Sequence, residues 1–175
     1  MATKKTMTGK RRLTALLEES ESRFRGAMTV MVEGLAILSP DGAYIFTNRT
    51  FDEYLECSGA GVQGLTPHDI KVDRLLSDGS ICSPDNYPAL TTLRTGRAVR
   101  DFVMGFRYAD GRICWVQINT ASMQVNQDSR AGVVMTFSDI TARRHAEDQM
   151  KLAFEAIRHS GEGIVVTDVE HRILS

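Results

Sequence analysis

Apolar and small residues near the N-terminus recur with the spacing of an α-helix. They are separated alternately by four and three positions, which puts them on one stripe and predicts a helix from about Thr14 to Val32. The stripe consists of Leu13, Leu17, Ser20, Phe24, Ala27 and Met31. A second helical stripe after Thr141 consists of Ala142, Ala146, Met150, Ala153 and Ile157. The core of a domain must then come from the segment between these two helices.

That segment begins with a predicted β-hairpin. Leu35–Ser39 and Tyr44–Thr47 have the composition of short strands, and Pro40-Asp41-Gly42 between them favours a tight turn. Asn48 is a good N-cap for a short helix that would run through Cys57. The hairpin and the helix together form the first part of an α+β arrangement.

Turn-forming residues dominate the next stretch, Ser58–Pro88, and predict irregular structure with one helical turn near His68 to Ile70. A helix is predicted to start at Asp85 or Asn86 and to run through Leu93. Gly96 suits the left-handed cap that ends such a helix.

Three longer β-rich stretches follow, and they complete an α+β fold class. They are Val99–Tyr108, Arg112–Met123 and Arg130–Ser138. Asp110-Gly111 is expected to turn the first pair, and the polar stretch Gln127–Ser129 to turn the second.

The start of this pattern occurs twice in the chain. The segment from Glu33 to Thr47 returns in ungapped register at Glu162 to Leu174. A period this long fits a whole small domain plus its connector, and the second copy stops before it could bury a core. We therefore expect residues 1–19 to form a basic tail and the start of a helix, 20–141 a domain, 142–160 a linker helix, and 161–175 a truncated second domain.

Composition narrows the possible functions. The 175 residues are 42% hydrophobic and 25% charged, with 21 basic against 22 acidic side chains, so charge does not predict a nucleic-acid or membrane partner. A basic run at the N-terminus is interpreted as a solvated tail: Lys4, Lys5, Lys10, Arg11 and Arg12. The sequence has neither a membrane-length apolar stretch nor a signal peptide, and we expect a cytoplasmic protein.

Candidate catalytic and metal chemistry is weak. Three cysteines, Cys57, Cys82 and Cys114, are an odd number without CxxC spacing, which suits a reducing compartment and predicts no zinc site. No Ser/His/Asp or Cys/His set has a recognisable spacing, so the fragment is not expected to be an enzyme. A GxGxxG match at Gly59 lacks the preceding strand that a dinucleotide site requires, and we interpret it as a turn.

Several motifs in combination resemble a PAS domain. They are the Glu-Gly-Leu-Ala-Ile-Leu-Ser-Pro-Asp-Gly opening at Glu33, Asn48 before the short helix, Asp110-Gly111 followed by Trp115, and the closing Phe-Ser-Asp-Ile-Thr at Phe137. The resemblance covers about Ser20 to Thr141. It implies a PAS fold: a five-stranded antiparallel sheet of order 2-1-5-4-3 with short helices, flanked by N-terminal and C-terminal linker helices. The repeated start then resembles a second PAS domain.

The resemblance also implies a pocket on the inner face of the sheet. Ligand-pocket candidates are Phe51, Tyr54, Leu90, Phe102, Met104, Phe106, Val116, Ile118, Thr120, Met135 and Phe137, with Val133 on the same face. This apolar surface has two interpretations, a packed core or a pocket for a small apolar ligand.

Haem and flavin are disfavoured as cofactors. The helix at Asp85 to Leu93, where haem-binding relatives commonly place the axial ligand, has no histidine, and His68 is the only alternative inside the domain. The reactive-cysteine motif of light-sensing flavin relatives is absent, and Val116 stands where they have an amide.

Tandem PAS domains resemble the sensory half of bacterial signalling proteins, whose output domains are diguanylate cyclases, cyclic-di-nucleotide phosphodiesterases or histidine kinases. By this resemblance, Asp139, Ile140 and Thr141 would relay a signal into the C-terminal helix and on to an output domain of the same parent chain. The apolar stripe at Leu13, Leu17, Phe24 and Met31 predicts a homodimer through the first helix. The alternatives are a helix that folds back over its own sheet and a scaffold that only docks partners.

Overall fold

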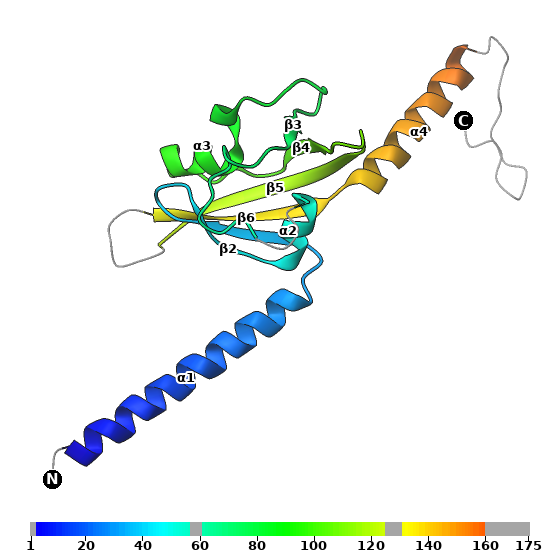
Figure 1. The fold of residues 1–175 in the computed structure, drawn as a ribbon. Helices are drawn as coiled ribbons and strands as arrows, with labels where there is room; N and C mark the ends of the chain where they lie inside the picture. Colours follow the sequence, from blue (N-terminus) through cyan, green and yellow to red (C-terminus); the bar gives the residue numbers. More distant parts are fainter. Residues whose placement is uncertain (1–2, 57–60, 125–130, 160–175) are drawn as a thin grey trace, which may run out of the picture. The chain divides into compact units, whose positions relative to one another are not determined.

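A six-stranded antiparallel sheet of order β2-β1-β6-β5-β4-β3 forms the centre of the computed structural model (Figure 1), which describes residues 3–56, 61–124 and 131–159. The strands are β1 (Gly34–Leu38), β2 (Tyr44–Thr47), β3 (Asp73–Leu75), β4 (Phe102–Arg107), β5 (Ile113–Gln124) and β6 (Ala131–Asp139). The five strands predicted from the sequence are present in the predicted order, and the α+β architecture is confirmed.

The sixth strand, β3, lies in the stretch that was expected to be irregular. It pairs antiparallel with β4, with Asp73 opposite Arg107 and Leu75 opposite Gly105. A strand of three residues is too short to show a recognisable alternation, because a two-residue period needs at least four or so positions to be distinguished from chance.

The two predicted hairpin turns within the described residues are confirmed. Gly42 has a φ of 85° and donates its backbone N–H to Ser39 O at 2.9 Å. Gly111 also has a φ of 85° and donates to Tyr108 O at 3.0 Å. A positive φ is strained for a residue with a Cβ, which explains glycine at both positions. The expected turn at Gln127–Ser129 lies outside the described residues.

Two short helices lie next to the sheet: α2 (Arg49–Tyr54) packs against β1, and α3 (Pro88–Thr95) packs against β5 and β6. Asn48 is the N-cap of α2, as predicted, and its side chain accepts a hydrogen bond from Phe51 N. Gly96 ends α3 in the left-handed conformation, also as predicted. The 3-10 turn η1 (Pro84–Asn86) precedes α3, so the predicted single helix from Asp85 is two elements. Pro88 explains the division, because the residue before a proline avoids helical geometry.

The N-terminal helix α1 (Thr3–Thr29) differs from its predicted bounds at both ends. Its start means that the basic run at Lys4 to Arg12 lies within a helix, and the prediction of a simple tail there was wrong. Lysine, arginine, methionine and leucine are good helix formers, and in residues 3–13 they outnumber the threonines and the glycine, which favours this extension. The helix ends before Met31, which therefore does not belong to it. Thr29, Val30 and Val32 are β-branched, and their restricted side chains disfavour further helix.

The C-terminal helix α4 (Thr141–His159) lies where the sequence predicted a helix, and Thr141 is its first residue. The chain divides into two units, Met1–Asp139 and Ile140–Ser175, and α4 belongs to the second. The expected second domain at 161–175 lies outside the described residues. Neither α1, α4 nor any other described helix has an apolar stretch long enough to cross a membrane.

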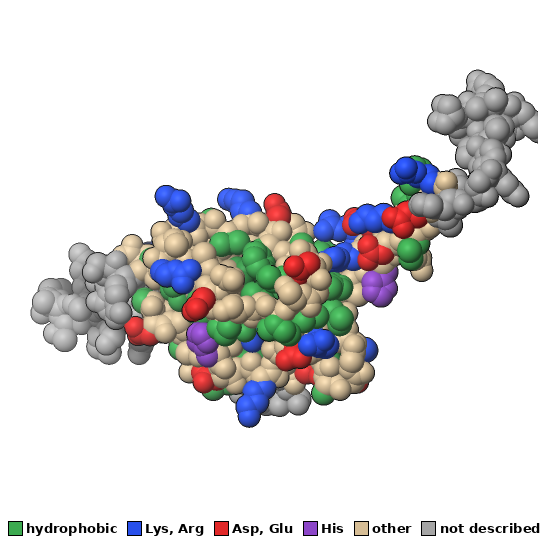
Figure 2. Space-filling view, turned by 90° about the horizontal axis from the view of Figure 1, so that it is seen from above, with side chains coloured by type: hydrophobic (Ala, Val, Ile, Leu, Met, Phe, Trp, Pro, Cys, Tyr) green, Lys and Arg blue, Asp and Glu red, His purple; other side chains and the backbone are tan. Residues whose placement is uncertain are grey.

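The core lies between the inner face of the sheet and the segment from α2 to α3. Its largest fully buried side chains are Phe51, Phe106, Leu38, Met104, Ile118, Val62, Val116, Val133 and Thr92. On the face seen in Figure 2, acidic and basic side chains are interspersed around a band of apolar side chains. This distribution matches the near-zero net charge of the chain.

Candidate functional site

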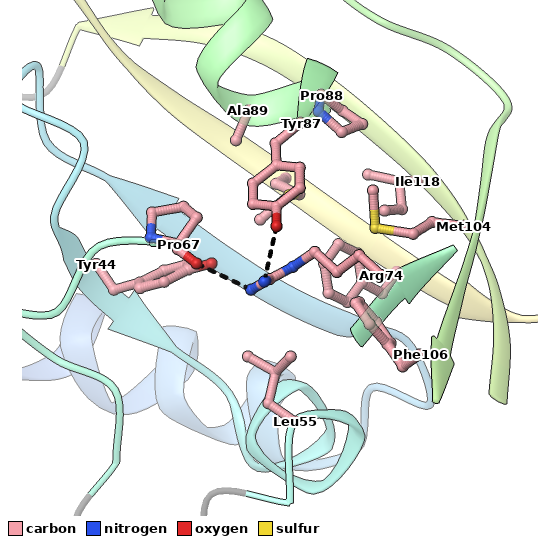
Figure 3. A pocket seen from close by; sticks show the side chains of 12 residues that line it. Tyr44, Leu55, Pro67, Arg74, Tyr87, Pro88, Ala89, Met104, Phe106 and Ile118 are labelled. Atoms are coloured by element: carbon pink, nitrogen blue, oxygen red, sulfur yellow. Dashed lines mark hydrogen bonds between the residues drawn. The ribbon is translucent and has the colours of Figure 1, made fainter. Parts of the chain in front are cut away.

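A small cavity lies within the core, between the inner face of the sheet and the segment that contains β3 and α3 (Figure 3). Its volume is about 20 Å³, which is room for roughly one water-sized group. The lining residues are Tyr44, Leu55, Pro67, Arg74, Tyr87, Pro88, Ala89, Met104, Phe106, Ile118, Met135 and Phe137. The lining is apolar apart from the two tyrosines and one arginine.

Arg74 is the charged residue of this cavity, and it is 7% exposed. Its Nη1 donates to Tyr87 Oη at 3.0 Å, to Ile70 O at 3.3 Å and to Val72 O at 3.4 Å, and its Nη2 donates to Pro67 O at 3.1 Å. The guanidinium carbon also lies 4.5 Å from the centre of the Tyr87 ring. Figure 3 shows the guanidinium between Tyr44, Tyr87 and Leu55. All of these partners are formally neutral.

The alternation of strand β3 directs Arg74 inward. Its neighbour Asp73 is exposed and forms an ion pair with Arg107 of β4, Nη2 to Oδ2 at 3.0 Å. Successive side chains of a strand point to opposite faces, so pairing Asp73 at the surface places Arg74 in the core. Behind it, Cys82 N donates to Arg74 O at 2.7 Å, which holds the start of the next segment against the strand.

A second, larger hollow lies on the outer side of Arg74. This outer groove has a volume of about 640 Å³ and shares Leu55, Arg74 and Tyr87 with the cavity. Its remaining lining is Glu56, His68, Ile70, Lys71, Val72, Asp73, Pro84, Arg107, Tyr108 and Ala109. The side chains of Arg74 and Tyr87 therefore lie between a small, mostly apolar cavity and a larger groove.

The structure brings together only part of the candidate set from the sequence. Five candidates line the cavity: Met104, Phe106, Ile118, Met135 and Phe137. Six others lie elsewhere in or beside the core: Phe51, Tyr54, Leu90, Phe102, Val116 and Thr120. Phe51 stacks on Phe137 with ring centres 4.9 Å apart, so it supports the cavity wall from behind.

Sequence reasoning missed Arg74 and Tyr87, the two polar side chains that face both hollows. The run Val72-Asp73-Arg74-Leu75 gave no usable signal, because a strand of three residues is too short to show the alternation that would separate a buried arginine from an exposed one. Tyr87 immediately precedes Pro88, which holds it in extended geometry at the start of α3.

An aromatic contact connects the cavity wall with helix α2, whose Tyr54 is influenced by the end of β6. Phe137 lines the cavity, and its ring centre lies 6.5 Å from that of Tyr54 on α2. Burial raises the pKa of Tyr54, and the charge of Asp139 raises it further. Tyr108 Oη donates to Tyr54 O at 2.9 Å. Asp139 is exposed at the end of β6, Ile140 is buried, and Thr141 begins α4.

The predicted dimer helix has exposed apolar side chains. Leu17 is 60% exposed and Phe24 is 45% exposed, whereas Met31 lies beyond the helix and is half-buried. The side chain of Leu13 lies outside the described residues. The ring of Phe24 lies 5.4 Å from that of Phe46 in β2, so the last turns of α1 also contact the sheet edge.

Other candidate chemistry in the sequence does not converge on the cavity. His68 is exposed at the outer groove, where its ring lies 6.3 Å from that of Tyr87. Burial raises the pKa of the Cys82 thiol, with an opposing effect from Arg74. Within the described residues, no group of three or more His, Cys, Asp or Glu side chains could hold a metal ion. Gly61 and Gly64 of the GxGxxG match have φ values of 64° and 82°, as in turns.

Comparison with known families gives a clear assignment. The family model described as the PAS fold matches residues 28–145, well over half of the chain. The chain belongs to the PAS family. No curated protein matches it.

Solved structures agree with the PAS fold. The PAS domain of an HTR-like protein from Haloarcula marismortui is 17% identical, with a TM-score of 0.54, and the match covers 74% of this chain and 99% of that one. An RNA-binding light-oxygen-voltage receptor is 19% identical, with a TM-score of 0.56 and coverage of 85% and 40%. The E. coli DhaR(N)-DhaL complex is 11% identical, with a TM-score of 0.52 and coverage of 75% and 40%. Likeness at these identities shows a shared fold, and ligand and output differ widely among proteins that share one.

Proposed function

We propose that this PAS domain is a cytoplasmic, non-catalytic sensory and dimerisation module that relays a signal through α4 to an output domain of the same parent chain. A cyclic-di-nucleotide cyclase or phosphodiesterase and a histidine kinase are the proposed output classes. The proposed organisation has the domain at 20–141, a linker helix at 142–160, and the start of a second PAS domain at 161–175.

One observation carries the relay proposal: Tyr54 lies beside the ring of Phe137 and close enough to Asp139 for that charge to raise its pKa. A change in packing at the cavity would move Phe137, which is two residues from the end of the same strand. Asp139 stands two residues before the first residue of α4, where a negative charge stabilises the helix N-terminus. The relay then needs two arrangements of this junction that are close in free energy.

Dimerisation through α1 is supported by the exposure of its apolar side chains. Leu16, Leu17 and Phe24 are each 45% exposed or more, and burying them against a second helix would remove apolar area from water. The contact between Phe24 and Phe46 supports the alternative for the last turns of α1, in which the helix covers its own sheet.

A second candidate function is a ligand-free interaction scaffold. The observation that favours it is the cavity volume of about 20 Å³, because such a core is nearly filled by its own side chains. Under this alternative the domain would dimerise or dock a partner without binding a small molecule. The same volume leaves no room for a haem macrocycle, so the haem-sensor alternative receives no support.

Replacing Asp139 with Ala tests the relay. We expect the output activity of the full-length parent to change and the amide hydrogens of the first turns of α4 to exchange faster, while exchange in the sheet is unaltered. Asp148→Ala is the matched control, because Asp148 is an exposed carboxylate on the same helix whose Oδ1 lies 3.8 Å from Lys151 Nζ. Unchanged output and unchanged exchange in Asp139→Ala would reject the role of Asp139.

A further inference from the structure

We propose that Arg74 is the recognition residue for a small organic monocarboxylate, which binds with its carboxylate on the Arg74 guanidinium and its apolar part in the outer groove. This inference rests on the proposed sensory function and names the ligand class that the domain would sense. It assigns Tyr87 as the second donor to the carboxylate.

The charge balance of Arg74 is the first argument. Arg74 is only 7% exposed. In the described part of the chain, no carboxylate lies within ion-pair distance of its guanidinium. Its nearest acidic neighbour in sequence, Asp73, is already paired with Arg107 on the other face. Three backbone carbonyls and one phenol satisfy hydrogen bonds but carry no net charge. A buried cation without a counter-charge favours binding of an anion.

The hydrogen-bonding inventory is the second argument. A guanidinium has five N–H donors, and the four hydrogen bonds of Arg74 all use Nη1 and Nη2. Among the described residues Nε has no hydrogen bond and Nη2 uses one of its two protons, so the guanidinium has N–H groups left to donate to a carboxylate. Tyr87 Oη accepts from Arg74 Nη1 and has its own proton left to donate.

The surroundings decide the class of anion. One uncompensated guanidinium balances one negative charge, whereas a phosphate dianion would leave excess charge beside apolar walls. Leu55, Ile70, Val72 and Ala109 line the outer groove and suit an apolar substituent. Lys71 also lines that groove but is exposed to solvent, so Arg74 is the buried charge that the anion balances. Arg107 and Glu56 are each paired there, with Asp73 and Arg112 respectively. A volume of about 640 Å³ is in the range of small-molecule sites.

A direct test is titration calorimetry of the 175-residue chain with benzoate and with benzamide, its neutral near-isostere. We expect benzoate to bind at least about tenfold more tightly than benzamide, which corresponds to one charge-assisted hydrogen bond. Acetate and butyrate show whether the apolar part contributes, with butyrate expected to bind more tightly. Equal affinities for benzoate and benzamide, no binding of any of these acids at millimolar concentration, or tighter binding of inorganic phosphate would each overturn the proposal.

Variants identify the residues. Arg74→Gln is expected to abolish the preference for benzoate over benzamide, and Arg74→Lys is expected to retain part of it. Tyr87→Phe is expected to weaken the binding of benzoate by about tenfold. Arg49→Gln is the matched control, since Arg49 is an exposed arginine that pairs with Glu53 and lines neither hollow. A folded Arg74→Gln protein that binds benzoate as the native chain does would overturn the assignment.

Two further measurements distinguish a failure of the ligand assignment from a failure of the proposed relay. If Arg74→Gln does not fold, the Nε–H resonance of Arg74 in the native chain decides, because benzoate should shift it and benzamide should not. Carboxylate binding with no effect of Asp139→Ala on output would reject the relay and leave this ligand assignment intact. Altered output in Asp139→Ala with no carboxylate binding would reject the ligand assignment and leave the relay intact.

Discussion

The hydroxyl oxygens of Thr92 on α3 and Thr120 on β5 lie 2.6 Å apart in the buried core. Thr92 Oγ1 donates its proton to Arg97 O at 2.9 Å, so Thr120 must be the donor between the two hydroxyls. Thr120 Oγ1 in turn accepts from Val99 N at 3.1 Å. This chain of hydrogen bonds fixes α3 and the segment after it onto the longest strand of the sheet.

Thr120→Val is therefore expected to lower the free energy of unfolding by about 1–3 kcal/mol, because it leaves the backbone N–H of Val99 without its buried acceptor. Urea unfolding followed by circular dichroism measures the change. Thr95→Val is the control, since Thr95 is exposed and its hydroxyl donates to Thr91 O where water can replace it. Equal losses for the two variants would contradict the buried role of Thr120.

Asn48 connects three parts of the backbone through one amide. Its Oδ1 accepts from Leu35 N at 2.8 Å and from Phe51 N at 3.0 Å, and its Nδ2 donates to Glu33 O at 2.9 Å. Asn48→Ala should cost about 2 kcal/mol or more in unfolding free energy, since it removes the helix cap and the tie to β1 together. Asn48→Asp keeps the acceptor and loses only the donor, so a smaller loss is expected. A lower free energy of unfolding for Asn48→Asp than for Asn48→Ala would contradict this ranking.

Gly34 is required by a close approach between β1 and α2. A Cβ built there would lie 3.1 Å from Phe51 Cα and 3.1 Å from Tyr54 Cδ2. Gly34→Ala is expected to destabilise the domain by about 1–3 kcal/mol in thermal or urea unfolding, because backbone must shift to admit it. Gly26→Ala on α1 is the matched substitution in open space and should instead raise helical content. A neutral Gly34→Ala would contradict the tight packing.

Because of Tyr108, the free energy of unfolding is expected to fall at alkaline pH. Burial raises its pKa above the usual value of 10.0, and the charges of Cys114 and Glu56 act in the same direction. The folded state therefore holds the phenolic proton more tightly than the unfolded chain. Its stabilising contribution is complete below pH of about 10 and falls as the pH rises above that value. Urea unfolding across this range should show the decline, and Tyr108→Phe should reduce it. An unchanged pH slope in Tyr108→Phe would assign the decline to Tyr54, whose pKa burial also raises.

The proposed dimer helix can be tested by molar mass in solution. Leu17→Glu places a charge in the exposed apolar stripe of α1 and is expected to shift the chain from dimer to monomer in light scattering after size exclusion. Glu18→Lys is a control at an exposed position one residue away, off the stripe. A native chain that is monomeric at high concentration would favour the alternative in which α1 only covers its own sheet.

The sequence alone determined those elements whose signals are local. The Asn48 cap, the turns at Gly42 and Gly111 and the left-handed Gly96 all follow from the conformational preferences of single residues. The long strands followed from their β-rich composition, and the alternation of their side chains from the two-residue period of a strand. The family resemblance supplied the buried face and the strand order. The start of α1 and the split between η1 and α3 were less accessible, since threonines and a glycine weaken the helical pattern of residues 3–9 and a proline divides the other pair.

Only the tertiary structure decided the site. Arg74 belongs to a three-residue strand whose existence depends on pairing with β4, so its inward direction cannot be inferred from its neighbours alone. Tyr87 reaches the same guanidinium from the start of α3, thirteen positions away, and Pro67 provides its carbonyl from a third segment. Local preference sets which residues form helices, strands and turns. Bringing a buried charge together with its partners depends on contacts between segments, which packing of the whole core determines.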